Sequence, residues 1–145
     1  MSLPRGHALV CALVVFAGGA AAVGIAVWRY EHRYNEPELP EEYRGVANPL
    51  EDDHAARDAG ARLFSRNCAP CHGPDADGRG PAAPGLNPPP ADFRGGPILR
   101  NHSDAFLYWR IAEGKHGTAM PQWDGVLTEN ERWEVIAFLR SLEPD

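Results

Sequence analysis

Cys68-Ala-Pro-Cys71-His72 is the stretch of sequence that decides the fold of this 145-residue chain. The pattern C-x-x-C-H is the attachment signature of a c-type haem, in which two thiols bond the vinyl groups of the porphyrin and the adjacent histidine binds iron. One helical turn separates the cysteines, so both sulfurs lie along one edge of a flat macrocycle, with His72 under its centre. The sequence therefore predicts one covalently bound haem c, held by Cys68 and Cys71, with His72 as an iron ligand.

Two other uses of paired cysteines fit the surrounding sequence less well. A thioredoxin-type C-x-x-C follows a strand and opens a helix in a βαβ unit, and no such alternation surrounds these residues. A structural zinc site needs four ligands, whereas the one further cysteine, Cys11, lies far upstream in an apolar run, as a small apolar filler. Haem attachment is the interpretation that also uses the histidine.

A second iron ligand is predicted from the methionines. Met120 is the only methionine after the start residue, and it lies in the stretch G-T-A-M-P-Q-W over residues 117–123. Its thioether, opposite the imidazole of His72, gives a six-coordinate iron whose reduction potential is higher than with two nitrogen donors. Methionine also fills gaps in ordinary cores. His102 and His116 are alternative ligands that would lower the potential.

Hydrophobic periodicity predicts three helices and no strand. An amphipathic pattern over residues 55–68 leads directly into the haem-binding turn. A serine N-cap and a glycine stop bound a second helix over residues 103–114, and a T-x-x-E capping box opens a third over residues 128–142. Gly60 costs about 1 kcal/mol inside a helix, which indicates that another helix crosses closely there.

Residues 73–97 contain seven prolines and six glycines, a composition that excludes regular structure and also stiffens the chain. We expect this segment to wrap the haem edge. The ring nitrogen of His72 that does not bind iron needs a hydrogen-bond acceptor, for which the carbonyls of Pro81 and Pro84 are equal candidates. Two haem propionates need donors, and the candidates are Arg94, Arg100, Trp109 and Trp123.

A candidate membrane anchor occupies residues 1–30. The twenty residues 8–27 carry no charge, and at 1.5 Å per residue this length matches the ~30 Å hydrocarbon core of a bilayer. Two aromatic residues follow at once and suit the membrane–water boundary, so a transmembrane helix is predicted over about residues 8–28. The alternative is a cleaved secretory signal with small residues at 20–22, but the apolar run is longer than a usual signal core.

Residues 31–53 are predicted to be an acidic linker, because eight acids and three prolines leave little to bury. Residues 54–145 then form the haem domain. The positive-inside rule, if anything, places the N-terminus outside, but haem is attached on the oxidising side of the membrane. We therefore expect a single-pass protein of the inner (cytoplasmic) membrane whose haem domain faces the periplasm. The net charge of −6, without a basic stripe, excludes a nucleic-acid binder.

Three motifs resemble those of class I cytochromes c: G-x-x-L-F-x-x-x-C-x-x-C-H-G over 60–73, G-x-x-M-P-x-W over 117–123, and L-T-x-x-E-R-W-x-V-I-x-F-L-R-S-L over 127–142. The resemblance implies an all-α fold with three main helices and a Pro/Gly-rich loop around one haem. It also implies that Gly60 and Phe64 of the first helix meet Val135 and Phe138 of the last. The chain is similar, too, to monohaem subunits of alternative complex III and to haem domains of haem-copper oxidases.

These features indicate an electron carrier rather than an enzyme. An iron with both axial positions filled is a good relay and a poor substrate site. We therefore expect the chain to carry single electrons from a quinol-oxidising donor to a terminal oxidase or another acceptor, as a subunit of a respiratory or photosynthetic electron-transfer complex. Its partners are then redox proteins or other subunits of a membrane complex. Two alternatives stay open: a haem enzyme or gas sensor in which Met120 dissociates, with His116 handling protons, and a structural subunit whose haem stays idle.

Overall fold

The structure is a computed structural model that describes residue 24, residues 38–94 and residues 97–143. Apart from residue 24, the predicted anchor at about residues 8–28 lies outside this described part, and so does the beginning of the predicted linker. Among the described residues, none of the helices has both the length and the apolar character needed to span a bilayer.

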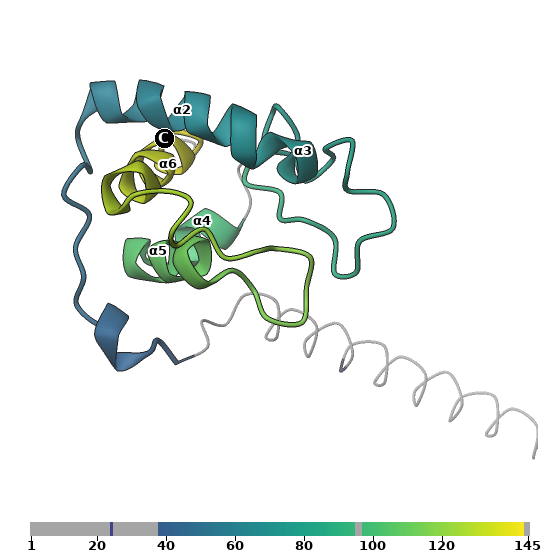
Figure 1. The fold of residues 1–145 in the computed structure, drawn as a ribbon, viewed down its shortest axis with the longest axis horizontal. Helices are drawn as coiled ribbons and strands as arrows, with labels where there is room; N and C mark the ends of the chain where they lie inside the picture. Colours follow the sequence, from purple (N-terminus) through teal and green to yellow (C-terminus); the bar gives the residue numbers. More distant parts are fainter. Residues whose placement is uncertain (1–23, 25–37, 95–96, 144–145) are drawn as a thin grey trace, which may run out of the picture. The chain divides into compact units, whose positions relative to one another are not determined.

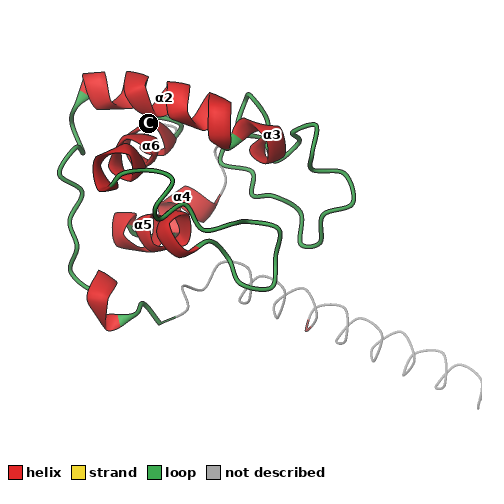
Figure 2. Ribbon diagram, in the orientation of Figure 1, coloured by secondary structure: helices red, strands yellow, loops and turns green. Residues whose placement is uncertain are grey.

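The described part of the chain is helical and contains no strand (Figure 1). Its elements are the 3-10 helix η1 (Glu41–Tyr43) and the α-helices α2 (His54–Asn67), α3 (Ala69–His72), α4 (Pro97–Asn101), α5 (Asp104–Glu113) and α6 (Glu129–Arg140). The three predicted helices are α2, α5 and α6, and loops connect them (Figure 2). The short helix α4 is an addition at the end of the Pro/Gly-rich segment. The all-α class is confirmed.

Side-chain caps explain where the three long helices begin. Asp53 accepts hydrogen bonds from the backbone of the first turn of α2, at 2.8 Å from Ala55 N. Ser103 caps α5, as predicted, and Thr128 with Glu131 forms the complete predicted capping box of α6. Each cap satisfies backbone N–H groups that a helix start leaves unpaired, which contributes about 1 kcal/mol.

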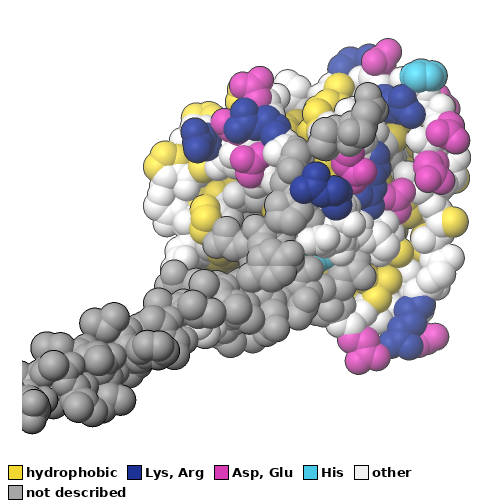
Figure 3. Space-filling view, turned by 180° about the vertical axis from the view of Figure 1, so that it is seen from behind, with side chains coloured by type: hydrophobic (Ala, Val, Ile, Leu, Met, Phe, Trp, Pro, Cys, Tyr) yellow, Lys and Arg dark blue, Asp and Glu magenta, His cyan; other side chains and the backbone are white. Residues whose placement is uncertain are grey.

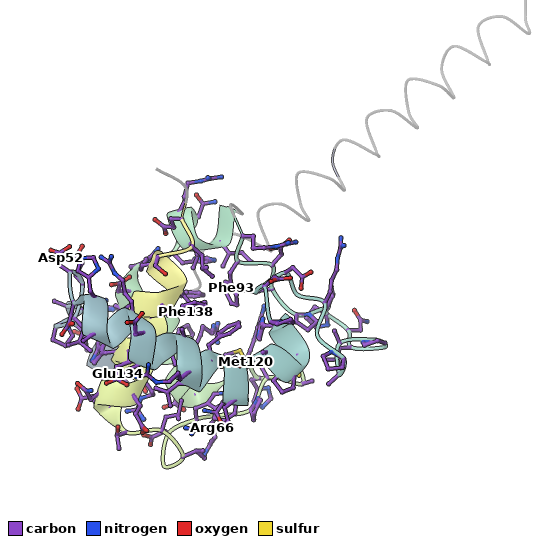
Figure 4. The ribbon with its side chains drawn as sticks, turned by 90° about the horizontal axis from the view of Figure 1, so that it is seen from above. Asp52, Arg66, Phe93, Met120, Glu134 and Phe138 are labelled. Carbon is purple, nitrogen blue, oxygen red and sulfur yellow. The ribbon has the colours of Figure 1, made fainter. Side chains whose placement is uncertain are left out.

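Helix α2 crosses α6 at Gly60, where the two backbones touch. A Cβ added at Gly60 would lie 1.8 Å from the carbonyl oxygen of Glu134 and 3.0 Å from the Cβ of Phe138. Beside this contact the rings of Phe64 and Phe138 pack with centroids 5.2 Å apart, and Figure 4 shows Glu134 and Phe138 on the side of α6 nearest α2. The close crossing implied by Gly60 is confirmed, with Glu134 as the nearest backbone.

We expect Gly60→Ala to destabilise the domain by about 2–3 kcal/mol, because the added methyl group meets backbone that has no room to move. For a domain of this size that corresponds to a fall in melting temperature of roughly 10–20 °C, measurable by circular dichroism. Ser65→Ala, on the exposed face of the same helix, is the matched control and should change stability by less than about 0.5 kcal/mol. An unchanged melting temperature for Gly60→Ala would mean that the helices do not cross there.

The core lies between α2, α5 and α6. Tyr108 of α5 stacks on Trp133 of α6 with ring centroids 4.2 Å apart, and Leu99, Val135 and Ile136 are almost fully buried. Polar contacts close one end of this core, where Arg140 forms an ion pair of 2.5 Å with Asp104 and also donates to backbone carbonyls. The rear surface in Figure 3 carries positive and negative side chains interspersed.

Residues 38–53, named the strap, differ from the expectation of a solvated linker. Four side chains of the strap pack against the core: Leu39, Tyr43, Val46 and Leu50. Two hydrogen bonds fasten it to α5, from Tyr43 Oη to Glu113 (2.8 Å) and from Asn48 Nδ2 to Asp104 (2.7 Å). The prediction of a solvated linker gave more weight to the eight acids of residues 31–53 than to these four apolar residues. The four recur every three or four positions and pack against the same core.

The contact between Tyr43 and Glu113 should make the strap sensitive to alkaline pH. Burial, and then the hydrogen bond to Glu113, raise the pKa of Tyr43 from 10.0 to about 12. Because the folded state holds this proton more tightly, the stability it contributes is complete below pH 10.0 and is lost as the pH rises through 12. Urea titrations should show wild type losing stability relative to Tyr43→Phe across that window. A constant difference between the two proteins would contradict this.

Candidate haem site

The C-x-x-C-H motif forms a single helical turn at the end of α2. Cys68 closes α2 through its backbone N–H, which donates to Phe64 O at 2.8 Å, and its own carbonyl accepts from His72 N at 2.8 Å. The turn is α3, with Cys68 as its N-cap residue and Cys71 and His72 as its last two residues. Both thiols are free and half-buried. The predicted geometry of the motif is therefore present.

Burial makes Cys68 a poor redox thiol. Loss of contact with water, and then the neighbouring Cys71, raise the pKa of Cys68 to about 12. A thiol of a redox-active C-x-x-C has a lowered pKa, because the thiolate is the nucleophile. The thioredoxin-type interpretation is disfavoured by this environment as well as by the absence of a βαβ unit from the described residues.

His72 has one ring nitrogen engaged by the backbone. Its Nδ1 lies 3.1 Å from the carbonyl oxygen of Ala91, so the expected acceptors, Pro81 and Pro84, are wrong. With Nδ1 donating, Nε2 carries the lone pair that a metal binds. Burial lowers the pKa of His72, opposed by the bond to Ala91, and so favours the neutral ring that ligation requires.

Two aromatic rings hold the imidazole of His72 from the sides. Phe93 packs on it with centroids 5.0 Å apart and planes 33° apart, and Phe64 lies at 6.4 Å. Phe93 is itself fixed by a backbone bond to Ala76 O of 2.8 Å, and Ala76 is fully buried. Figure 4 shows Phe93 directed into the interior of the domain. The orientation of the imidazole is therefore set by packing as well as by its hydrogen bond.

The Pro/Gly-rich segment is hydrogen-bonded to α3. Gly80 N donates to Cys71 O at 3.1 Å, and Ala82 N donates to Pro70 O at 2.8 Å. A Cβ at Gly80 would lie 2.3 Å from Pro70 O, so the close approach of the two segments requires glycine. The segment thereby brings the carbonyl of Ala91 back to His72.

Met120 lies in the loop between α5 and α6, residues 114–127, here named the Met120 loop (Figure 4). The residue is half-buried. Its N–H donates to Thr118 Oγ1 at 3.2 Å and its carbonyl accepts from Lys115 N at 3.2 Å. Gly114 packs on the same backbone, since a Cβ there would lie 2.7 Å from Met120 O. These contacts fix the backbone from which the thioether extends.

The other residues considered from sequence occupy different settings. His116 is exposed, and His102 is buried with its ring stacked on Phe106 at 4.1 Å. Among the propionate candidates, Arg94 faces Asp77 and Asp92 at 3.7 and 3.6 Å and Arg100 is exposed. Trp109 is covered by the guanidinium of Arg110 at 3.8 Å, and Trp123 is half-buried.

Sequence reasoning missed two contributors to this site. One is the carbonyl of Ala91, which any residue could supply and which therefore leaves no signal in the sequence. The other is Arg132, a buried side chain of α6 that bonds to the Met120 loop. The sequence signal for Arg132 was a charged residue within the apolar pattern of a predicted amphipathic helix. A charged residue that is buried there needs a partner, because charged side chains are rarely fully buried unless they are paired.

The donor set fits a covalently attached haem. Two half-buried thiols lie on one turn, the adjacent imidazole has Nδ1 occupied and Nε2 available, and a fixed loop carries the only internal methionine. Thiol, imidazole and thioether are the groups that tether and ligate haem c.

Comparison with known proteins gives the family. The family model described as cytochrome C oxidase, cbb3-type, subunit III matches residues 55–139. The cbb3-type cytochrome c oxidase subunit FixPc of Rhizobium leguminosarum bv. viciae is 33% identical over 99 residues, and subunit FixP of Rhizobium etli is 31% identical over 98 residues. Each alignment covers 68% of this chain and 31% of the relative. The chain therefore spans about a third of the length of these curated relatives.

Two solved structures share the fold. A chain of the reducing HAO-like protein complex of Kuenenia stuttgartiensis matches 79% of this chain and 54% of its own length, with a TM-score of 0.57 and 28% identity. Cytochrome cL of the marine methylotroph Methylophaga aminisulfidivorans matches 75% and 68%, with a TM-score of 0.54 and 26% identity. Together with the family match, they show a monohaem class I c-type cytochrome with one covalent haem c. The chain belongs to the cytochrome c oxidase, cbb3-type, subunit III family, whose cytochrome c domain transfers electrons.

Proposed function

We propose that this chain is a membrane-anchored electron carrier that passes single electrons on the outer side of the membrane, from a quinol-oxidising donor to a terminal oxidase. The observation that carries the proposal is the arrangement at α3, where a free dithiol turn is joined to a neutral imidazole whose Nδ1 is held by Ala91 O at 3.1 Å. The haem supplies the one-electron chemistry, because its iron cycles between the ferric and ferrous states.

Four residues hold the cofactor in this proposal. Cys68 and Cys71 would form the two thioether links, and His72 would supply Nε2 as an iron ligand. Met120 would supply its thioether sulfur as the second iron ligand. With both residues bound, the haem would offer no open position for a substrate and would serve one-electron transfer.

The packing of the domain supports transfer rather than catalysis. The imidazole lies between Phe64 and Phe93, and the Pro/Gly-rich segment is hydrogen-bonded to α3 from Gly80 and Ala82. These contacts fix the orientation of the imidazole. A catalytic haem would instead need an open position with a proton-handling group beside it, and His116, the candidate for that role, is exposed to solvent.

The membrane anchor stays a proposal from sequence, because residues 8–28, apart from residue 24, lie outside the described part. An uncharged run of this length suits a single span. Covalent haem attachment favours the periplasmic side for residues 54–145. Confinement near the membrane would raise the effective concentration of the haem domain beside a membrane-bound partner.

An oxidase is proposed as the electron acceptor because two relatives of this chain, FixPc and FixP, are cbb3-type cytochrome c oxidase subunits. The test is stopped-flow spectroscopy on membranes that contain the full chain. After addition of quinol, the haem should become reduced and then reoxidised by oxygen at the rate of respiration. A haem that stays silent would overturn the carrier function. Rapid binding of carbon monoxide to the reduced protein would favour the gas-sensor alternative.

A further inference from the structure

Arg132 is a buried cation that joins three parts of the domain. It lies near the start of α6 and is 7% exposed. Its guanidinium donates to Tyr108 Oη of α5 at 2.7 Å, and to Leu127 O and Asp124 Oδ1 of the Met120 loop at 2.8 and 2.9 Å. The same group lies over the Tyr108 ring, 5.0 Å from its centroid. Two of its three acceptors therefore belong to the loop that carries Met120.

The last residue of the Met120 loop, Leu127, is buried in the core at 5% exposure, but the residues just before it have little apolar packing. Residues 121–126 are exposed except for half-buried Trp123, and Val126 is 66% exposed. Two kinds of polar contact hold this stretch. Backbone bonds join Trp123 N and Asp124 N to Ala112 O at 3.0 Å, and the Arg132 clamp holds its end. Asp124 contributes to this clamp through an ion pair of 2.9 Å with Arg132.

Stability alone does not explain a buried arginine at this position. The Nε–H of Arg132 has no partner, and an unpaired buried donor carries a desolvation cost. An apolar side chain of similar volume often replaces a buried ionic group with no loss of stability. The partner carboxylate of Asp124 is 66% exposed, so this pair contributes little as a surface ion pair. What the arginine provides specifically is a fixed position for the loop.

We propose that Arg132 is a positioning residue for Met120: by clamping the end of the loop to α5 and α6, it keeps the thioether on the iron. This inference rests on the proposed function, in which Met120 is an axial ligand. Without the clamp, the loop opens more often, and the fraction of molecules with the sulfur detached rises. An added ligand that competes for the vacated position then binds more tightly in proportion to that fraction.

The test is an imidazole titration of the ferric full-length holoprotein, with the far-red charge-transfer absorbance of the iron–sulfur bond as a second readout. Arg132→Met should increase the apparent affinity for imidazole by about ten- to a hundredfold, the ratio that corresponds to a lost hydrogen bond to a charged group. The far-red absorbance should also disappear at a lower temperature than in wild type, before the helices unfold.

Arg140→Met is the matched control, because Arg140 is a second partly buried arginine of α6 whose partners, such as Asp104 and His102 O, lie outside the Met120 loop. This control should lose stability but keep its imidazole affinity within about twofold of wild type. The proposal is overturned by an Arg132→Met affinity equal to wild type, or by an equal increase in both variants.

Asp124→Ala decides the matter if Arg132→Met yields no folded holoprotein. It keeps the bonds of Arg132 to Tyr108 and Leu127 and removes one anchor of the loop. A severalfold increase in imidazole affinity supports the clamp, and no increase overturns it. A wild-type protein without far-red absorbance would instead show that Met120 is not a ligand, so the proposed ligation itself would fail.

Discussion

Replacing Cys68 and Cys71 together with serine should abolish covalent haem. Both sulfurs lie on the one helical turn that follows α2, and no other thiol of the described residues is available to form a thioether link. We expect the haem stain on a denaturing gel to fall below about one hundredth of wild type, because the bond is covalent and is not replaced by packing. Single serine variants should retain one link and a weaker stain.

Cys11→Ser is the matched control for this experiment. It removes the third cysteine of the chain, which lies in the uncharged N-terminal run far from α3 in sequence. We expect full haem staining from this variant at equal expression. Persistent staining of the Cys68→Ser, Cys71→Ser double variant, or loss of staining from the control, would contradict the assignment of the tether.

Replacing Met120 should give the second large effect, on the iron rather than on the tether. Met120→Ala should eliminate the far-red absorbance of the ferric protein and open the iron to added ligands. Met120→His should eliminate the same absorbance while keeping the iron six-coordinate, and it should lower the reduction potential, because nitrogen donors favour ferric iron. Axial ligands set haem potentials over a range of about 0.8 V, so the shift should be easily measured by redox titration.

Gln122→Ala controls for disturbance of the Met120 loop. Its side chain is exposed and lies two residues from Met120. This variant should retain both the absorbance and the potential of wild type. If Met120→Ala kept its far-red absorbance, a different residue would be the axial ligand, and the histidines at 102 and 116 would have to be reconsidered.

The helices could be predicted because their signals are local. The cap residues of α5 and α6 act on N–H groups within three residues of themselves, and the structure shows both caps in place. The close helix crossing at Gly60 could also be predicted, because a glycine inside a helix lowers helix stability and a close neighbour gives a reason for it. The carbonyl of Glu134 is that neighbour.

Contacts between distant segments were not readable in the same way. The acceptor for His72 is a carbonyl nineteen residues away, at Ala91 rather than Pro81 or Pro84, and it depends on the path of the whole Pro/Gly-rich segment. The strap was mispredicted for a different reason. The sequence shows Tyr43 and its apolar neighbours, but the many acids around them led to the prediction of a solvated linker. The role of Arg132 required three acceptors brought together by the fold.

Mass spectrometry of the purified wild-type chain under denaturing conditions tests the central claim most directly. The account predicts a mass equal to the polypeptide plus one haem, with the added mass confined to the peptide that contains Cys68, Cys71 and His72. Alkylation should then leave those two cysteines unmodified. An unmodified polypeptide mass, with both cysteines open to alkylation, would contradict it.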